Sequence, residues 1–162
     1  MVIFTEDYKR RVSNRMLQSG YRIAAVPRIV VRQMDNALAQ AFSPGDATRW
    51  YSDEQGPNAY SYFLSAIGFD VCSAISERCA FLGLDVTRLQ VTVGADTSSS
   101  GENRLSGIRL NVLLDGGAGS EQLLSAIRES MPFSALLNTL AKCTAITKEF
   151  KINGADVSSD AG

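Results

Sequence analysis

The chain has 162 residues, 45% of them hydrophobic and 20% charged, which is enough for one well-buried core in one domain or in two small lobes. Its formal net charge of −1 argues against a nucleic-acid-binding protein, because phosphate binding needs a clustered excess of lysine and arginine. The absence of histidine excludes the usual general base, the usual zinc ligand and any nucleophile paired with histidine.

Apolar runs in the sequence are too short to span a bilayer, and no basic segment followed by an apolar signal core opens the chain. We therefore expect a cytoplasmic protein that binds neither a membrane nor nucleic acid. The three cysteines, Cys72, Cys79 and Cys143, are odd in number and lack CxxC spacing, which favours neither a disulfide scaffold nor a zinc ribbon. We expect no metal and no cofactor.

The N-terminal third combines strand-like segments with turn signals. The basic run Lys9 to Arg11 with Arg15 is typical of a solvated face. Tyr21 to Ala25 and Arg28 to Gln33 are rich in β-branched residues and flank Pro27, so both segments are predicted strands. Ser43 to Asp46 has the composition of a turn.

A long helix is predicted from about Asn58 to Phe81, closed by Leu82-Gly83. Apolar residues recur there at steps of three and four: Tyr60, Phe63, Leu64, Ile67, Val71, Ala74, Ile75 and Leu82. Asp70 is the one charged residue in the otherwise apolar or small stretch from Ser65 to Ile75. An unpartnered carboxylate on an apolar helix face costs several kcal/mol, so Asp70 needs a partner, solvent or a proton.

The remainder of the chain alternates strands and helices. We predict strands at Leu89 to Ala95 and Ile108 to Leu114, helices at Ser120 to Glu129 and Phe133 to Cys143, and a last strand at Lys148 to Gly154. Met131-Pro132 separates the two helices. This order predicts an α+β fold with helices packed on an antiparallel sheet. We expect a single domain over residues 1–162, with a strand region at 1–52 and the central helix, hairpin and C-terminal helices at 53–154.

The stretch GPNAYSYFLSAIG (residues 56–68), followed by a hairpin, two short helices and a late cysteine, resembles the OsmC/Ohr family of osmotically induced and organic hydroperoxide resistance proteins. The resemblance covers about Asp53 to Asn153. It implies antiparallel sheets around a long central helix in an intertwined homodimer, with active sites at the subunit interface. It also implies reduction of organic hydroperoxides by a cysteine on the central helix, with a second, resolving cysteine and an activating arginine and glutamate.

This chain departs from the family pattern at the positions that carry the chemistry. An alignment without gaps puts Ala59 at the second proline of the pattern, Ser61 at the activating glutamate and Asp70 at the reactive cysteine. The second cysteine, usually followed by proline, falls on Cys143, which Thr144 follows here. The carboxylate thus occupies the position of the reactive thiol in the relatives.

Two interpretations of Asp70 remain open. It is either a structural carboxylate paired with an arginine across the subunit interface, or a general acid/base or electrostatic anchor in an inherited pocket. Cys143 is either a nucleophile activated by a cation or a residue that lines the pocket. Cys72 and Cys79 are expected to be small core residues that point away from Asp70. The remaining candidate contacts with a substrate are Tyr60, Ser61, Phe63, Arg28, Arg32 and Arg49.

Three functions follow from these alternatives. The first is acid/base or cysteine-assisted chemistry on a small organic substrate, of a hydrolase, lyase or isomerase type, with Asp70 as the proton-transfer group. The second is thiol-dependent reduction of organic hydroperoxides through Cys143 or Cys72. The third is a binding protein without catalytic activity, in which Asp70 has a structural role.

Overall fold

The computed structural model describes residues 4–19, 30–33, 39–42, 50–52, 59–97 and 105–157. The chain divides into two compact units, which are considered separately. One unit contains Met1–Tyr21 and Ile67–Gly162, and the other contains Arg22–Ala66. The long helix α2 (Ala59–Phe81) begins in the second unit and continues into the first.

The smaller unit contains a three-stranded antiparallel sheet in the order β1-β2-β3. Its strands are β1 (Val30–Gln33), β2 (Ala39–Phe42) and β3 (Trp50–Ser52). β1 falls within the strand predicted at Arg28 to Gln33, which confirms that prediction in part. The predicted strand at Tyr21 to Ala25 and the predicted turn at Ser43 to Asp46 lie outside the described residues.

Helix α2 confirms the central helix predicted from about Asn58 to Phe81, since it starts at Ala59 and ends at Phe81. Ile67, Val71, Ala74 and Ile75 repeat at helical spacing and are buried. The helix ends at Phe81, and the turn that follows contains Gly83, whose φ of 68° is left-handed. The Leu84 N–H donates to the Cys79 carbonyl at 2.9 Å. A glycine in this conformation with this bond closes a helix in the Schellman manner, because glycine alone adopts positive φ without steric cost.

The larger unit is built on a four-stranded sheet in the order β4-β5-β6-β7. Its strands are β4 (Val86–Thr97), β5 (Leu105–Gly116), β6 (Ala145–Ile152) and β7 (Ala155–Val157). β4 and β5 form the predicted antiparallel pair, and both are longer than the sequence indicated. In β5, Ile108, Leu110, Val112 and Leu114 are buried while Arg109 and Asn111 are exposed, which is the alternation of a sheet covered on one face.

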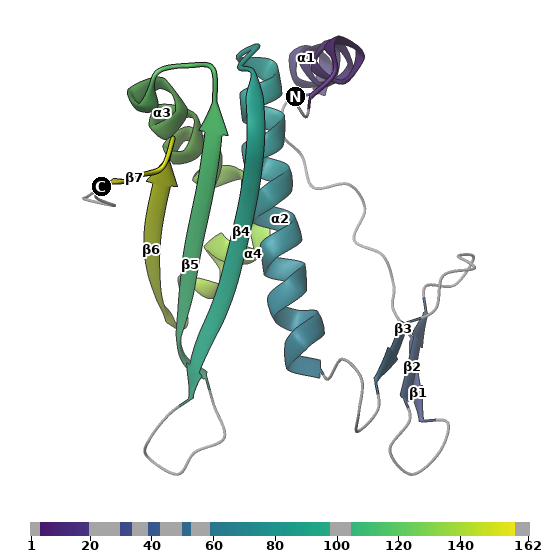
Figure 1. The fold of residues 1–162 in the computed structure, drawn as a ribbon. Helices are drawn as coiled ribbons and strands as arrows, with labels where there is room; N and C mark the ends of the chain where they lie inside the picture. The colour runs from purple at the N-terminus through teal and green to yellow at the C-terminus, as the bar shows by residue number, and fades with distance from the viewer. Residues whose placement is uncertain are drawn as a thin grey trace. The chain divides into compact units, whose positions relative to one another are not determined.

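The prediction of a purely antiparallel sheet is wrong at one pair of strands. β5 and β6 are parallel, with Ile108 opposite Ile146 and Leu114 opposite Ile152. The chain between them forms helices α3 (Ser120–Ser130) and α4 (Ala135–Leu140) and so returns to the end of the sheet from which β5 starts. A helical crossover of this kind is what a parallel pair requires (Figure 1).

The strand predicted at Lys148 to Gly154 is β6, which starts earlier, at Ala145, and ends earlier, at Ile152. β6 stops at Ile152 because Asn153 and Gly154 have positive φ values of 49° and 81°, which is the pattern of a tight two-residue hairpin turn. β7 then pairs antiparallel with β6. The Asn153 side chain fixes the neighbouring loop, since its Oδ1 accepts from the Gly116 N–H at 2.9 Å.

Helices α2, α3 and α4 cover one face of the four-stranded sheet. A Cβ atom at Gly68 of α2 would meet Val93 of β4 at 3.4 Å, so this helix packs closely on the first strand. α3 contributes Leu123, Ala126 and Ile127, all fully buried. Arg78 of α2 pairs with Glu129 of α3, which connects the two helices. The Arg78 guanidinium also lies 5.5 Å from the centre of the Phe81 ring on α2.

The predicted third helix, Phe133 to Cys143, is wrong at both ends. Met131–Phe133 form a turn of 3₁₀ helix that contains Pro132, and α4 starts only at Ala135. Ser134 has an extended backbone and its hydroxyl accepts from the Leu137 N–H at 3.3 Å, so it is the N-cap of α4. α4 ends at Leu140, and turns carry the chain from there to β6.

Helix α1 (Glu6–Ser19) was not predicted. Its N-terminus is capped by Thr5, whose hydroxyl accepts from the Tyr8 N–H at 3.2 Å. The expectation that this basic segment is a solvated face is wrong for Lys9, which is 8% exposed. Within the described parts of the chain, no helix has both the length and the apolar character that a membrane crossing needs.

Candidate functional site

The Asp70 side chain forms hydrogen bonds with the first turn of α4. Its Oδ2 accepts a hydrogen bond from the Ser134 hydroxyl at 2.5 Å and another from the Leu136 N–H at 3.0 Å. The carboxylate is partly buried, whereas Ser134 is 0% exposed. The partner that Asp70 was expected to need is therefore the start of another helix.

The two donors make this corner of the molecule favourable for an anion. The first N–H groups of a helix have no partner within that helix and carry a partial positive charge. The Leu136 N–H is one of these groups, and Ser134 orders a second by accepting from Leu137 while it donates to Asp70. The Asp70 carboxylate, which belongs to α2, thus accepts hydrogen bonds from donors at the N-terminus of α4.

Cys143 lies at the other end of α4. Its N–H donates to the Leu140 carbonyl at 2.9 Å and its thiol donates to the same oxygen at 3.3 Å. The side chain is exposed. A six-residue helix is roughly 9 Å long, so within one chain Cys143 and Asp70 lie at opposite ends of α4.

The other two thiols are protected by burial. Cys79 is fully buried, and desolvation raises the pKa of its thiol to about 11. Cys72 is half-buried, and desolvation raises its pKa as well. Because the thiolate is the reactive form, both residues are poor nucleophiles in this state of the protein.

The predicted contact residues of α2 lie in its first turns, within the smaller unit. Tyr60 is 59% exposed and Phe63 is 38% exposed, and Ser61 is exposed as well. Arg28 and Arg49 lie outside the described residues, and Arg32 is described only by its backbone pairing with Gln40 in β1 and β2. The role of these six residues stays a prediction.

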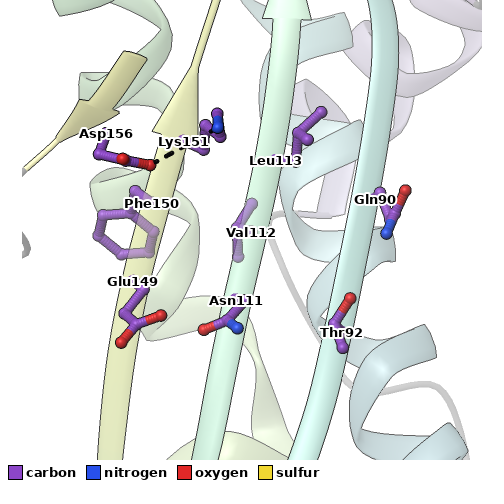
Figure 2. A pocket seen from close by; sticks show the side chains of 9 residues that line it. All are labelled: Gln90, Thr92, Asn111, Val112, Leu113, Glu149, Phe150, Lys151 and Asp156. Carbon is purple, nitrogen blue, oxygen red and sulfur yellow. Dashed lines mark ion pairs between the residues drawn. The ribbon is translucent and has the colours of Figure 1, made fainter. Parts of the chain in front are cut away.

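A shallow depression lies on the face of the four-stranded sheet opposite the helices (Figure 2). Its exposed side chains are polar or charged and come from all four strands: Gln90, Thr92, Asn111, Glu149, Lys151 and Asp156. Lys151 and Asp156 pair across β6 and β7 at 3.9 Å. Val112, Leu113 and Phe150 complete its lining. None of the predicted site residues lines this depression, and its exposed polar side chains are typical of a solvated sheet face.

Ser134 is the residue at this site that the sequence prediction missed. A serine directly after Pro132-Phe133 and before the apolar run Ala135 to Leu137 has the spacing of an N-cap. That signal marks the start of α4. It does not indicate that Asp70, 64 positions earlier, accepts from the same hydroxyl.

The fold is shared with solved structures of low sequence identity. An OsmC-like protein from Mycoplasma pneumoniae is 13% identical, with a TM-score of 0.71 over 80% of this chain and 99% of that chain. The organic hydroperoxide resistance protein OhrB of Bacillus subtilis is 12% identical, with a TM-score of 0.60 over 78% and 98%. A Vibrio cholerae structure, described as a putative organic hydroperoxide resistance protein with captopril bound in one of its active sites, gives a TM-score of 0.61 at 10% identity over 84% and 98%.

The family model of the OsmC-like proteins matches residues 52–149, which is more than half of the chain. The chain belongs to the OsmC-like family. The comparison with curated proteins gives no match.

Proposed function

We propose that this protein is a member of the OsmC-like family that binds a small organic molecule and does not reduce hydroperoxides at the family's reactive position. The observation that carries the proposal is the pair of hydrogen bonds from Ser134 and Leu136 to the Asp70 carboxylate. Hydroperoxide reduction by a thiol needs a thiolate that attacks the peroxide and becomes a sulfenic acid. A carboxylate cannot take that oxidation step.

The same geometry favours Met131 over Cys143 as the counterpart of the family's second cysteine. Two cysteines that form a disulfide have Cα atoms roughly 4.4–6.8 Å apart. Asp70 contacts the segment that follows Met131-Pro132, whereas Cys143 lies beyond the far end of α4. Met131 is also followed by the proline that the family pattern expects. In this alignment neither position of the cysteine pair carries a thiol.

The acid/base hypothesis has less support than the binding hypothesis. A general base must reach a substrate proton within hydrogen-bonding distance. Oδ2 of Asp70 already accepts from two donors that hold α4 in place, so proton transfer at this oxygen would disturb the helix start. Full activity of Asp70→Asn on an identified substrate would exclude the acid/base role.

Binding of a small organic molecule is supported by the relatives and by the exposed aromatic residues. The Vibrio cholerae protein binds captopril in one of its active sites. In this chain the first turns of α2 expose Tyr60 and Phe63, which provide apolar contact area. Captopril and 2-phenylpropan-2-ol, a stable analogue of cumene hydroperoxide, are therefore suitable probes for calorimetric titration. Saturable heat from either probe is expected, and its absence for both contradicts the binding role.

Asp70→Cys tests the proposal by gain of function. The donors that stabilise the carboxylate also favour a thiolate, because both are anions at a helix N-terminus. We expect the wild type to consume no cumene hydroperoxide above the blank with a dithiol reductant, and Asp70→Cys to acquire thiol-dependent consumption. Asp70→Ser is the matched control without a thiol. Wild-type turnover that disappears in Asp70→Asn contradicts the proposal.

A second candidate function is thiol-dependent hydroperoxide reduction through Cys143. It is favoured by the similarity to the Bacillus and Vibrio hydroperoxide resistance proteins and by the exposure of this thiol, which alone among the three cysteines is exposed. The Cys143 thiolate would attack the hydroperoxide to release an alcohol, and the dithiol would reduce the sulfenic acid to release water. Wild-type turnover that disappears in Cys143→Ser and persists in Cys72→Ser selects this function.

We also infer that the protein forms a homodimer, as the family resemblance implies. Phe69 projects from the larger unit's part of α2 with 73% of its surface exposed, an unusual state for a phenylalanine on a helix this apolar. Light scattering in solution is expected to give twice the chain mass of 17.5 kDa, and Phe69→Asp is expected to reduce the mass to that of a monomer. A monomeric wild type contradicts the inference.

A further inference from the structure

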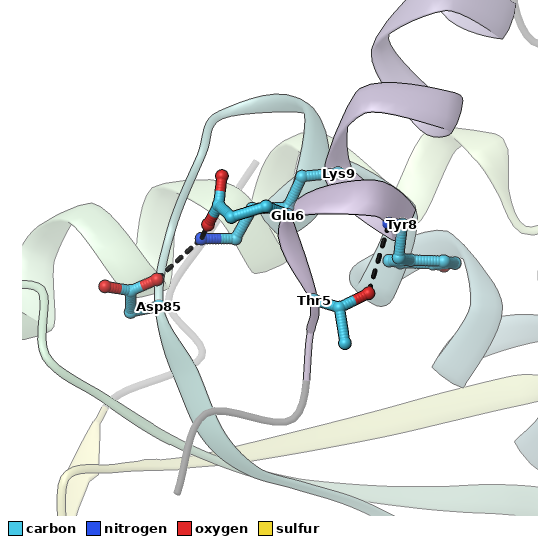
Figure 3. A network of polar contacts seen from close by, with 5 residues as sticks. All are labelled: Thr5, Glu6, Tyr8, Lys9 and Asp85. Atoms are coloured by element: carbon cyan, nitrogen blue, oxygen red, sulfur yellow. Dashed lines mark hydrogen bonds and ion pairs between the residues drawn. The ribbon is translucent and has the colours of Figure 1, made fainter.

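The carboxylates of the larger unit differ in whether a cation lies beside them. Lys9 of α1 pairs with Asp85 at 2.6 Å (Figure 3). Glu77 of α2 pairs with Arg15 of α1 at 2.5 Å. Asp70, the other carboxylate of α2, has two hydrogen-bond donors, but no lysine or arginine of the described residues pairs with it. Within that part of the chain its negative charge is therefore not balanced by a cation.

The hydrogen bonds to Asp70 use only one of its two carboxylate oxygens. The Ser134 hydroxyl and the Leu136 N–H both donate to Oδ2, and no donor among the described residues bonds to Oδ1. Oδ1 is not enclosed either, because the fully buried side-chain oxygens without a partner in these residues belong to Asp115 and Thr144. The two bonds at Oδ2 fix the carboxylate in one orientation. Oδ1 is thus an accessible acceptor in a defined position, which favours recognition of a ligand.

Exposed apolar side chains belong to the two segments that meet at this carboxylate. Phe133 and Leu136 stand on either side of Ser134 in the sequence and are 37% and 42% exposed. Phe69 precedes Asp70 on α2 and is 73% exposed. We assign Phe69 to the subunit interface, so Asp70 lies beside that interface. Binding sites for small molecules typically combine apolar surface with a few fixed polar groups, and both are present here.

We propose that the ligand of this protein is a small organic cation, a protonated amine with an aromatic or branched aliphatic group, whose ammonium donates to Asp70 Oδ1. The inference rests on the proposed function and names the chemical class of its ligand. A carboxylate only accepts hydrogen bonds, so the ligand must donate one. An ammonium supplies three donors and the opposite charge, and such bonds are stronger than those between neutral groups. The aromatic rings of Phe69 and Phe133 favour the same class, because the face of an aromatic ring attracts a cation.

Two probes with the same carbon skeleton separate the effect of charge from that of shape. At neutral pH 2-phenylpropan-2-amine is protonated, as alkyl amines are, whereas 2-phenylpropan-2-ol is neutral and of nearly the same size. Isothermal titration calorimetry of the full chain at neutral pH gives a dissociation constant for each probe. We expect the wild type to bind the amine about tenfold more tightly than the alcohol, which is the usual difference between a hydrogen bond to a charged group and one between neutral groups.

Three variants assign the preference to its source. Asp70→Asn keeps a side-chain oxygen and removes the charge, so the two probes are expected to bind it with equal dissociation constants. Glu77→Gln is the matched control, because it removes the other carboxylate of α2 and leaves Asp70 unchanged, and the tenfold preference is expected to persist. Leu136→Ala keeps the backbone donor to Asp70 and removes exposed apolar surface, so both probes are expected to bind more weakly with their ratio unchanged.

The outcomes distinguish this inference from the proposed function. Equal binding of both probes to the wild type overturns the inference and leaves the proposed function standing, as when an arginine of a second copy already occupies Oδ1. A preference for the amine that persists in Asp70→Asn, or disappears in Glu77→Gln, also overturns the inference, because the ammonium then binds elsewhere. Failure of both probes to bind overturns it as well, and the proposed function then fails only if captopril does not bind either.

Discussion

Asp70→Ala is expected to lower the free energy of unfolding by about 2 kcal/mol, within the range for hydrogen bonds to a charged group. The substitution removes the acceptor of the Ser134 hydroxyl and of the Leu136 N–H. Ser134 is fully buried, so its hydroxyl loses a partner that water cannot replace easily. Denaturant unfolding followed by circular dichroism measures the change.

Asp70→Asn is the matched control for this prediction. Its side-chain carbonyl accepts the same two hydrogen bonds but carries no charge, so the expected loss is only the charge–dipole part, about 0.3–1 kcal/mol. A carboxylate that is strained for catalysis behaves in the opposite way, because its removal leaves stability unchanged or increases it. Stability equal to the wild type in Asp70→Ala would therefore contradict the capping role.

Gly116→Ala is expected to destabilise the protein by about 1–3 kcal/mol, the usual cost of forcing extra volume into a packed site. A Cβ atom at Gly116 would lie much closer to the Asp85 carbonyl oxygen than van der Waals contact allows. That oxygen cannot move away freely, because it accepts from the Gly117 N–H at 3.0 Å. The Asp85 carboxylate also accepts a hydrogen bond from Lys9 of α1. A displacement of Asp85 is therefore expected to weaken the attachment of α1.

Gly117→Ala is the control at the next residue. A Cβ atom there meets only the Asp85 Cβ, at 4.0 Å, which is an ordinary contact. The expected change in unfolding free energy is below about 0.5 kcal/mol, as for most surface substitutions. Equal stability of the two alanine variants in denaturant unfolding would show that the close approach at Gly116 is relieved without cost.

The sequence predicts those elements whose signal is local. The spacing of Ile67, Val71, Ala74 and Ile75 places α2, and Gly83 ends it, because a helix buries a stripe at that period and glycine tolerates positive φ. β4, β5 and α3 are found for similar reasons. The family resemblance rests on these elements, and the family match over residues 52–149 confirms it.

Features that depend on distant partners were missed. The parallel pairing of β5 and β6 is decided by the route of the chain through α3 and α4, which no pattern within either strand reports. α1 is rich in charge, and Lys9 and Arg15 stabilise its docking through Asp85 and Glu77 far along the chain. A basic run of this kind is usually a solvated face, so its composition does not indicate that α1 packs against other segments.

The hydrogen-bond partners of Asp70 also come from a distant part of the chain. The sequence shows that Asp70 stands in an apolar helix face and therefore needs a partner, and this inference follows from the cost of an isolated charge. It does not show which partner, because Ser134 and Leu136 reach Asp70 only after the crossover folds back. Helix N-termini serve anions as well as an arginine does, so the expected arginine across the subunit interface stays a prediction.

The measurement that tests the role of Asp70 most directly is a double-mutant cycle of Asp70→Ala and Ser134→Ala in denaturant unfolding. If the carboxylate caps α4 through the Ser134 hydroxyl, the two losses are not additive, and the coupling free energy is at least about 1 kcal/mol, as for residues in one hydrogen-bond network. Additive losses, with a coupling below about 0.3–0.5 kcal/mol, would contradict the account and make Asp70 a candidate catalytic group again.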